Sequence, residues 1–393
     1  MQLTAEVEQY LRTMIETDAS DLYLTVARPA MYRIQGRIQA LGDRPFTPAE
    51  VERVAKSMMA DWQVKEVEEK FELNFAVSLP GVSRFRVNVF RQRGSVGLVI
   101  RRVKAEVESL EELGLPKILG ELAMSKRGLV LVVGATGSGK STTLAAMVDY
   151  RNSREQGHII TIEDPIEFVH RHKQSIVTQR EVGFDTHSFQ AALKNTLRQA
   201  PDVILIGEIR DTETMEAAIT FAETGHLCLG TLHSNNANQA IERIMNFFPI
   251  ARHAQIYLQL SLNLRAIVSQ RLIPSVDGRR VAALEVLVDT PRIRELIKRG
   301  HVDILKEGME QGIQEGCQTF DQALFALYKD GKISLVQALA NADSQNNLRL
   351  KIKLAGLKAD EDGSDGQDAP AQEPPKTGRS EPAGGTAFRI RRT

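Results

Sequence analysis

The segment Gly134-Ala135-Thr136-Gly137-Ser138-Gly139-Lys140-Ser141 gives the strongest indication of the fold of this chain. It matches the pattern G-x-x-x-x-G-K-[ST], in which glycines let backbone N–H groups turn inward around phosphates. The loop follows the apolar run Leu129–Val133 and precedes a helical pattern, so the positive end of a helix would also face the anion. A chance glycine-rich turn is the alternative, but with glycine at ~7% usage chance gives on the order of 0.01 matches in a chain of this length. The sequence therefore predicts a nucleotide-binding site.

Three residues at the end of this loop have particular expected roles. Lys140 would bring a positive charge to the β- and γ-phosphates, and Ser141 would offer its hydroxyl to Mg²⁺. Thr142 follows them and completes the set of candidate nucleotide-binding residues, Gly134 to Thr142.

Around the loop, short unbroken apolar runs alternate with helical patterns. The runs are Leu129–Val133, His158–Ile162, Val203–Ile206 and Leu227–Leu232. Strands that are apolar throughout and separated by helices indicate an α/β domain whose parallel sheet is buried on both faces. Ligands of such sheets lie beyond the carboxyl ends of the strands, so the residues that follow each run are the candidate site residues.

Polar residues follow each of the other three runs. Glu163 is the candidate for orienting or deprotonating the attacking water, with Glu167 as a weaker candidate; the alternative for Glu163 is a structural carboxylate before Pro165. Glu208 stands where a Walker-B carboxylate is expected and would hold Mg²⁺ directly or through water. His233 is expected to sense the γ-phosphate, although a lone histidine is more often structural.

Other polar residues near these runs receive different interpretations. Asp202 lies at the wrong end of its strand for catalysis and is expected to be a turn residue. His226 is as readily a structural residue as a site residue. His170 and His172 are expected on a solvated turn rather than at a metal, and Cys228 is expected in the core.

The first part of the chain has an α+β pattern. Residues 4–17 have apolar side chains at helical spacing, and Gln35-Gly36 indicates a hairpin turn between strands. From Arg84 to Phe90 apolar and polar residues alternate, which places Arg84 and Arg86 on the face opposite to the apolar side chains. The predicted divisions are a domain at 1–103, a linker at 104–116, a second domain at 117–350 and a mostly disordered tail at 351–393, where acidic and Pro/Gly-rich sequence follows.

Composition excludes several protein classes. The 393 residues contain 50 Lys+Arg and 50 Asp+Glu, so the formal net charge is zero and a uniformly basic nucleic-acid binder is excluded. No apolar run reaches the ~18 residues of a membrane span, and the N-terminus has no secretory pattern. Two cysteines cannot form a disulfide framework or a four-cysteine zinc site. We therefore expect a cytoplasmic protein of two domains.

With these motifs in place, the chain resembles the secretion ATPase superfamily and, within it, the PilT/PilU group of type IV pilus retraction ATPases. The resemblance extends over about residues 3–350. The matching segments are an opening signature at 19–22, the Walker A loop at 134–141, an Asp box at 161–167, a Walker B segment at 204–211 and a His box from 224 to 234.

The resemblance implies a RecA-like P-loop domain with a parallel-strand core, preceded by a smaller α+β PAS-like domain. It also implies a homohexamer that binds ATP and Mg²⁺ between the N-terminal domain of one subunit and the RecA-like domain of the next. Arg86, Arg91 and Arg101 are then candidates to stabilise transition-state charge; their alternative is ordinary exposed strand charge. The implied partners are a PilT-like ATPase and the inner-membrane pilus platform protein.

The branch within the superfamily rests on fewer residues. Assembly and secretion ATPases usually carry an extra N-terminal domain, and many carry a four-cysteine zinc element, which this sequence lacks. The retraction signature Ala-Ile-Arg-Asn-Leu-Ile is matched in part by residues 292–297, with departures at Arg292 and Glu295. Together with the segments 310–312 and 316–321 and the longer tail, these departures are more similar to PilU than to PilT. Three alternatives stay open: an assembly or secretion ATPase, a weakly hydrolysing accessory subunit of a mixed motor, and a RecA-like nucleic-acid motor.

Overall fold

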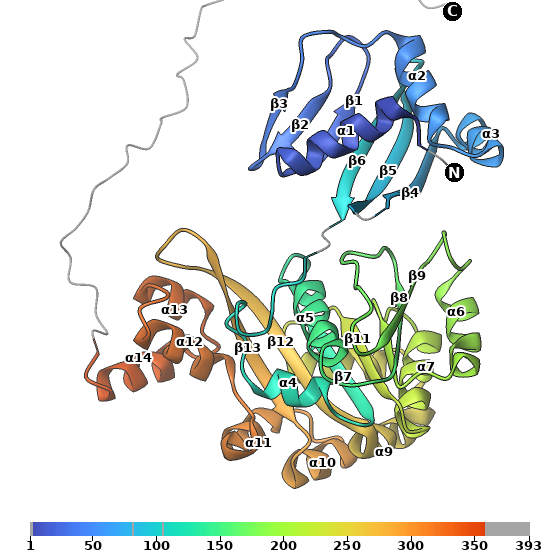
Figure 1. Ribbon diagram of the computed structural model, residues 1–393. Coiled ribbons are helices and arrows are strands. Elements are labelled where there is room, and N and C mark those ends of the chain that lie inside the picture. The colour runs from blue at the N-terminus through green and yellow to red at the C-terminus, as the bar shows by residue number, and fades with distance from the viewer. Residues whose placement is uncertain (1–2, 81, 104–105, 358–393) are drawn as a thin grey trace, which may run out of the picture.

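The computed structural model in Figure 1 describes residues 3–80, 82–103 and 106–357. In this part of the chain the strands form two sheets, one of six strands and one of seven. We refer to residues up to Val103 as the N-terminal domain and to the rest of the described chain as the C-terminal domain. No helix of the described residues is long and apolar enough to cross a membrane.

The N-terminal domain is an antiparallel sheet with three helices. Its helices are α1 (Ala5–Glu16), α2 (Pro48–Ser57) and α3 (Asp61–Lys70). Its strands are β1 (Ala19–Leu24), β2 (Met31–Ile34), β3 (Arg37–Ala40), β4 (Glu72–Leu79), β5 (Ser83–Gln92) and β6 (Ser95–Val103), in the spatial order β3-β2-β1-β6-β5-β4. The helix expected at 4–17 is confirmed as α1. The hairpin turn at Gln35-Gly36 is confirmed as well, and both residues have positive φ.

The side chains of strand β5 point alternately into the core of the N-terminal domain and toward the C-terminal domain. Phe85, Val87 and Val89 are at most 1% exposed and pack beneath the helices, as the alternating pattern predicts. Arg84 and Arg86 point the other way and contact residues of the C-terminal domain. The alternation of one strand therefore builds both the core and the contact between the domains.

The C-terminal domain is built on a seven-stranded sheet. Its strands are β7 (Gly128–Val133), β8 (His158–Glu163), β9 (Ile176–Glu181), β10 (Val203–Ile206), β11 (Leu227–Leu232), β12 (Leu264–Pro274) and β13 (Arg280–Val288), in the order β13-β12-β7-β11-β10-β8-β9. All neighbouring pairs are parallel except β12 with β13. This arrangement confirms the predicted mixed α/β fold with a parallel core.

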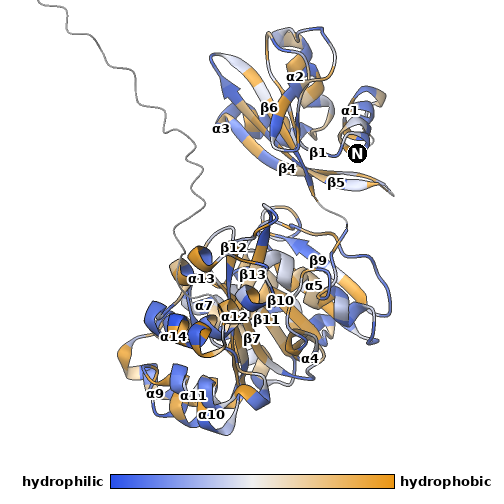
Figure 2. Cartoon of the chain, turned by 90° about the vertical axis from the view of Figure 1, so that its left-hand side faces the viewer, coloured by the Kyte–Doolittle hydropathy of each residue, from blue (hydrophilic) through white to orange (hydrophobic). Residues whose placement is uncertain are grey.

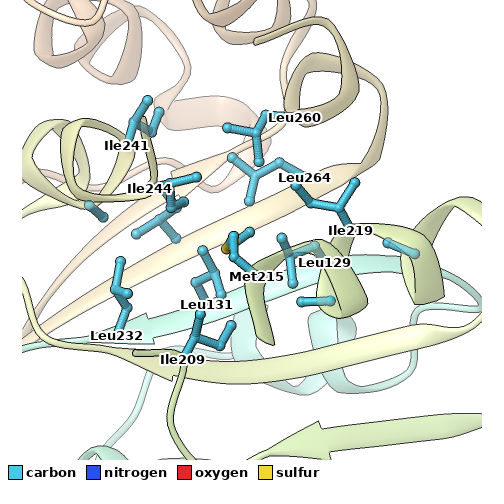
Figure 3. Close-up of a cluster of buried hydrophobic side chains, with 14 of the residues drawn as sticks. Leu129, Leu131, Ile209, Met215, Ile219, Leu232, Ile241, Ile244, Leu260 and Leu264 are labelled. Atoms are coloured by element: carbon cyan, nitrogen blue, oxygen red, sulfur yellow. The ribbon is translucent and has the colours of Figure 1, made fainter. Parts of the chain in front are cut away.

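Helices cover both faces of this sheet. They are α4 (Ile118–Ala123), α5 (Lys140–Asn152), α6 (Phe189–Thr196), α7 (Thr212–Glu223), α8 (Ala237–Asn246), α9 (His253–Asn263), α10 (Pro291–Lys298), α11 (Leu305–Gln311), α12 (Phe320–Lys329), α13 (Leu335–Asn341) and α14 (Gln345–Leu354). Alternate residues of β7 serve the two faces: Val130 and Val132 pack with α4 and α5, whereas Leu129 and Leu131 pack with α7 to α9. Figure 3 shows the second cluster, with Met215 of α7 beside Leu131. In Figure 2 the central strands are the most apolar part of the domain.

Two segments differ from the sequence-based divisions. A linker was expected at 104–116, but in its described part, 106–116, Leu110 and Leu115 are 3% and 8% exposed and pack into the core of the C-terminal domain. Helix α14 continues to Leu354, past the expected boundary at 350, because Ile352 is fully buried against α12 and α13. From residue 358 on, the tail predicted to be disordered lies outside the described residues.

Candidate functional site

The carboxyl ends of the parallel strands meet at a cavity of about 510 Å³. Five strands contribute to it: β7 through the phosphate loop, β8 through Glu163, β10 through Glu208, β11 through His233 and β12 through Leu272. Among the residues predicted from the sequence, those that line this cavity are Thr136, Gly137, Gly139, Lys140, Ser141, Thr142, Glu163, Glu167, Glu208 and His233. The structure therefore brings together the end of the loop and the three candidate residues of the other strands.

The phosphate loop has the backbone geometry of an anion cradle. Gly137 and Gly139 have φ of +77° and +89°, in the left-handed region that favours glycine, and α5 begins at Lys140. The Lys140 ammonium donates hydrogen bonds to the carbonyl oxygens of Gly134 and Ala135, at 2.9 and 3.0 Å. Burial lowers the pKa of Lys140, and the charge of Glu208 acts against this effect. The loop thus holds its own cation close to where phosphate oxygens would bind.

Gln270 of β12 supports the loop from behind, which the sequence analysis did not anticipate. Its Oε1 accepts a hydrogen bond from Oγ1 of Thr143 at 2.7 Å, and both residues are buried. A Cβ added to Gly134 would lie 2.6 Å from the Gln270 carbonyl oxygen, and one added to Gly139 would lie 2.8 Å from Gln270 Nε2. These glycines are therefore required by close packing against Gln270. The short apolar run at 266–268, just before Gln270, was the sequence feature that could have indicated a strand leading to this residue.

Glu163 ends β8 and faces the cavity from a largely buried position. Its Oε1 accepts hydrogen bonds from Oγ1 of Thr161 at 2.7 Å and from Nε2 of Gln179 at 3.1 Å. Burial raises the pKa of Glu163, although both hydrogen bonds favour the ionised form. A carboxyl group with a raised pKa and fixed orientation is suited to accept a proton from water.

Glu208 follows β10 and is held by two basic side chains. Its Oε1 lies 3.0 Å from Nε2 of His233, and its Oε2 lies 2.6 Å from Nη2 of Arg210. Burial favours the neutral acid, but the hydrogen bond from Arg210 and the charges of Arg210, His233 and Lys140 prevail, so the pKa of Glu208 is lowered. The environments of Glu163 and Glu208 thus shift the pKa values of these two carboxyl groups in opposite directions. This difference suits a proton acceptor, Glu163, beside a group that stays ionised, Glu208.

The residues present fit a hard divalent cation. Ser141 and Glu208, the two predicted ligands, both line the cavity, and Asp164 adds a further carboxylate to its lining. Hydroxyl and carboxylate oxygens are the donors that Mg²⁺ prefers, with water and phosphate completing its shell. In addition, the Ser138 hydroxyl in the loop is buried and has no hydrogen-bond partner among the described residues, as expected in a pocket for a polar ligand.

The three candidate arginines occupy different surroundings within this chain. Nη2 of Arg86 donates to the carbonyl oxygen of Ile166 at 2.8 Å and lies 3.9 Å from Glu167 Oε1, beside the cavity. Arg101 pairs with Asp21 at 2.7 Å, and Arg91 lies over the ring of Phe71. The structure therefore brings Arg86 to the edge of the site and leaves the other two in contacts within the N-terminal domain.

Three further polar residues make hydrogen bonds within the fold and do not line the cavity. Asp202 accepts a hydrogen bond from the backbone N–H of His158 at 2.8 Å, so it is the turn residue that was expected. His226 contacts Thr224 at the opposite end of β11 from His233. His172 is exposed, as predicted, and its Nδ1 accepts a hydrogen bond of 3.1 Å from the backbone N–H of Val177.

His170 differs from its predicted position. It was expected on a solvated turn, but it is mostly buried and lines the cavity. Burial lowers the pKa of His170 to about 4, so the ring is neutral at neutral pH. Other lining residues that the sequence analysis missed are Phe168, Leu272 and Arg280. They come from turns and from strands at the sheet edge that no motif marks.

Fold and site together define a P-loop protein of mixed α/β type, and comparison with known proteins gives its family. The family model described as "Type II/IV secretion system protein" matches residues 2–344. PilU of Pseudomonas aeruginosa, a type IV pilus ATPase, is 54% identical over 91% of this chain and 94% of that protein. PilT of the same organism, a type IV pilus retraction ATPase, is 43% identical over 87% of this chain and 99% of that protein.

A solved structure agrees with these sequence relatives. The crystal structure of the pilus retraction motor PilT with bound ADP has a TM-score of 0.80 and 45% identity, and the match covers 86% of this chain and 97% of that one. The chain therefore belongs to the type II/IV secretion system family and, within it, to the PilT/PilU group, with higher identity to PilU.

Proposed function

We propose that this protein is a Mg²⁺-dependent ATPase whose homohexameric rings power type IV pilus retraction and twitching motility. The observation that carries the proposal is the common cavity of Lys140, Glu163, Glu208 and His233. These are the groups that hydrolysis of a phosphoanhydride needs: a cation at the phosphates, an acceptor for the water proton, an anion for the metal and a hydrogen-bonding group near the reacting phosphate.

The chemistry follows from the surroundings of each group. The Glu163 carboxylate accepts a proton as water oxygen forms a bond to the γ-phosphorus and the bond to the bridging oxygen of ADP breaks. Thr161 and Gln179 keep this carboxylate in one orientation through their hydrogen bonds. Lys140 leaves its two loop carbonyls to contact the β- and γ-phosphates. His233 stays within reach of the γ-phosphate through its contact with Glu208.

Ser141 and Glu208 would hold the magnesium ion. When bound, Mg²⁺ neutralises charge that develops on the phosphate oxygens. Because Arg210 contacts Oε2 of Glu208, a metal held by Glu208 would share this carboxylate with the guanidinium. The lowered pKa of Glu208 favours the ionised carboxylate, which can pair with Arg210 or with the metal.

The contact between the domains provides a route from hydrolysis to movement. Arg86 of the N-terminal domain touches Ile166 and Glu167, in the segment that begins with Glu163. A change at the γ-phosphate that shifts this segment would therefore shift the N-terminal domain as well. Rotation of the domains around the ring is the motion we propose to drive retraction.

The proposed partners come from the likeness to PilU and PilT. We propose that the ring acts on the cytoplasmic side of the inner membrane against the pilus platform protein, together with a PilT-like ATPase. The departures from the retraction signature at Arg292 and Glu295 are the basis for proposing a partner-dependent role over an autonomous one. Phosphate release by the purified protein, alone and mixed with a PilT-like ATPase, distinguishes these roles. Turnover that rises only in the mixture supports the partner-dependent role, and full turnover alone contradicts it.

The enzymatic proposal is tested by Lys140→Ala, with Lys194→Ala on the exposed face of α6 as the matched control. We expect loss of steady-state phosphate release in the first variant and wild-type turnover in the second. Unchanged turnover in Lys140→Ala would eliminate the assignment.

The direction of the motor is tested in cells that lack the gene. Hyperpiliated cells without twitching support retraction. Bald cells would indicate the alternative, an assembly motor.

A further inference from the structure

His233 lies in a very short connection between two fixed elements. Strand β11 ends at Leu232 and helix α8 begins at Ala237, so only residues 233–236 join them. A connection of four residues has few conformations once both ends are held. The position of His233 therefore depends on how firmly each end is anchored.

The end at β11 is anchored by the central sheet. Leu232 is paired with Val133 at the start of the phosphate loop, and both are fully buried. Oγ1 of Thr231 also donates a hydrogen bond of 2.5 Å to the carbonyl oxygen of Gly207, the residue before Glu208. This end is thus fixed relative to both the loop and Glu208.

The end at α8 is anchored by a buried carboxyl group. Oε1 of Glu285, on β13, accepts a hydrogen bond of 2.8 Å from the N–H of Ala237, the first residue of α8. The same oxygen accepts one of 3.0 Å from Oγ of Ser269 on β12. Ala237, Ser269 and Glu285 are each at most 2% exposed. A first-turn N–H has no partner within its own helix, so the carboxyl supplies one that water cannot reach.

We propose that Glu285 is a positioning residue for hydrolysis: by fixing the first residue of α8, it holds the 233–236 segment and keeps His233 against Glu208. The inference rests on the proposed role of His233 and adds a residue that does not line the cavity. Glu285 touches neither nucleotide nor metal in this account.

The geometry connects this anchor with the phosphate loop. Ser269, which holds Glu285, is followed on β12 by Gln270, which packs against Gly134 and Gly139. Neighbouring residues of one strand thus support the two sides of the site. Because these contacts are buried, small displacements at β12 or β13 would move His233 relative to the loop, and a displacement of about 1 Å can lower turnover by about 10²-fold.

Glu285→Ala removes the acceptor, whereas Glu285→Gln keeps an oxygen that can accept both hydrogen bonds. Burial raises the pKa of Glu285, so the neutral amide is a close mimic of a carboxyl that is easily protonated. The control is Thr47→Ala, which removes the capping box of α2 in the N-terminal domain. It should cost stability as Glu285→Ala does without slowing hydrolysis. Ser269→Ala provides a milder loss if Glu285→Ala does not fold.

Two readouts test the proposal on the full chain. Hydrogen exchange of residues 233–239 reports the anchor itself, and we expect protection to fall at least about tenfold in Glu285→Ala and to be retained in Glu285→Gln. Steady-state hydrolysis should show kcat lower by about 10-fold to 100-fold with KM for ATP within about twofold, a split that general destabilisation does not produce. Ser269→Ala should show the same pattern with a smaller loss.

A double variant shows whether Glu285 acts through His233. If it does, His233→Ala combined with Glu285→Ala should be no slower than His233→Ala alone. The inference is overturned if the amides of residues 233–239 exchange in Glu285→Ala as they do in wild type. It is also overturned if Glu285→Ala raises this exchange but keeps the wild-type kcat, while His233→Ala lowers kcat. If His233→Ala itself turns over normally, the proposed role of His233 fails and the inference fails with it, even where exchange shows that the anchor exists.

Discussion

Arg84 of the N-terminal domain donates a hydrogen bond from Nη2 to Oε2 of Glu181 in the C-terminal domain at 3.1 Å. The two side chains are only 19% and 10% exposed, and the guanidinium also lies over the ring of Phe184 at 5.2 Å. Glu181 ends β9, paired in register with Glu163 at the end of β8. This ion pair therefore fixes the N-terminal domain beside the strand that carries the proposed proton acceptor.

The first prediction concerns the energy of this pair. A double-mutant cycle with Arg84→Ala and Glu181→Ala should give a coupling of about 1–3 kcal/mol in urea unfolding, because both charges are largely withdrawn from water. The matched control is the exposed pair Arg53–Glu6, whose side chains are 58% and 34% exposed and which should give a clearly smaller coupling because water screens both charges. A coupling no larger than that of the control pair would show that the domains are not held by Arg84.

The second prediction concerns Arg86, which reaches the edge of the cavity. Its Nη2 is engaged by Ile166, but its buried Nε has no hydrogen-bond partner among the described residues. Arg86→Ala should lower kcat by about 10²- to 10³-fold, because an arginine at a phosphoryl-transfer site stabilises charge in the transition state. Arg37→Ala on the exposed strand β3 is the control and should turn over normally. Equal turnover of both variants would remove Arg86 from the site.

The third prediction concerns the packing of the phosphate loop. Gly134→Ala would place a Cβ 2.6 Å from the carbonyl oxygen of Gln270, so the loop must shift, at a cost of about 1–3 kcal/mol in stability. We expect ATP affinity to fall at least tenfold in equilibrium binding. Gly278→Ala has open space and φ of +80°, so it reports backbone strain alone. ATP affinity equal in the two variants would contradict the close packing.

The fourth prediction concerns the pH dependence of stability at Glu163. Burial raises its pKa above the ordinary value of 4.5, so between these pKa values the folded protein binds more protons than the unfolded chain. The contribution of this carboxyl to the free energy of unfolding therefore falls as pH rises through that window and stays low above it.

Glu163→Gln removes this titration. The variant should unfold at a higher temperature than wild type at neutral pH, by about 2–4 °C per kcal/mol, and the difference should shrink toward acid pH. Thermal unfolding across pH measures it. A variant less stable than wild type at neutral pH would show that the carboxyl is not under desolvation strain.

The sequence predicted the centre of the C-terminal domain well because its signals are local. Four unbroken apolar runs became central strands, and the residues after them, Glu163, Glu208 and His233, meet at one edge by the geometry of parallel sheets. The phosphate loop was recognisable because glycine at fixed spacing and one lysine are rare by chance.

Features that depend on distant packing could not be predicted in this way. Strand β9 is an amphipathic edge strand, and β12 and β13 continue the sheet far along the chain, so no short pattern linked Gln270 or Glu285 to the site. His170 lies in a segment with the composition of a polar turn, and only the folded structure shows that its side chain is mostly buried. Leu110 and Leu115 were assigned to a linker because scattered leucines in a charged segment do not indicate which core they pack into.

The most direct test of the hydrolytic site measures ATP binding and phosphate release on the same preparation of Glu163→Gln, with Glu213→Gln at the exposed start of α7 as the control. If Glu163 accepts the water proton, the variant binds ATP within about twofold of wild type and releases phosphate about 10²- to 10⁴-fold more slowly. Phosphate release at the wild-type rate with ATP bound would contradict the assignment of the site.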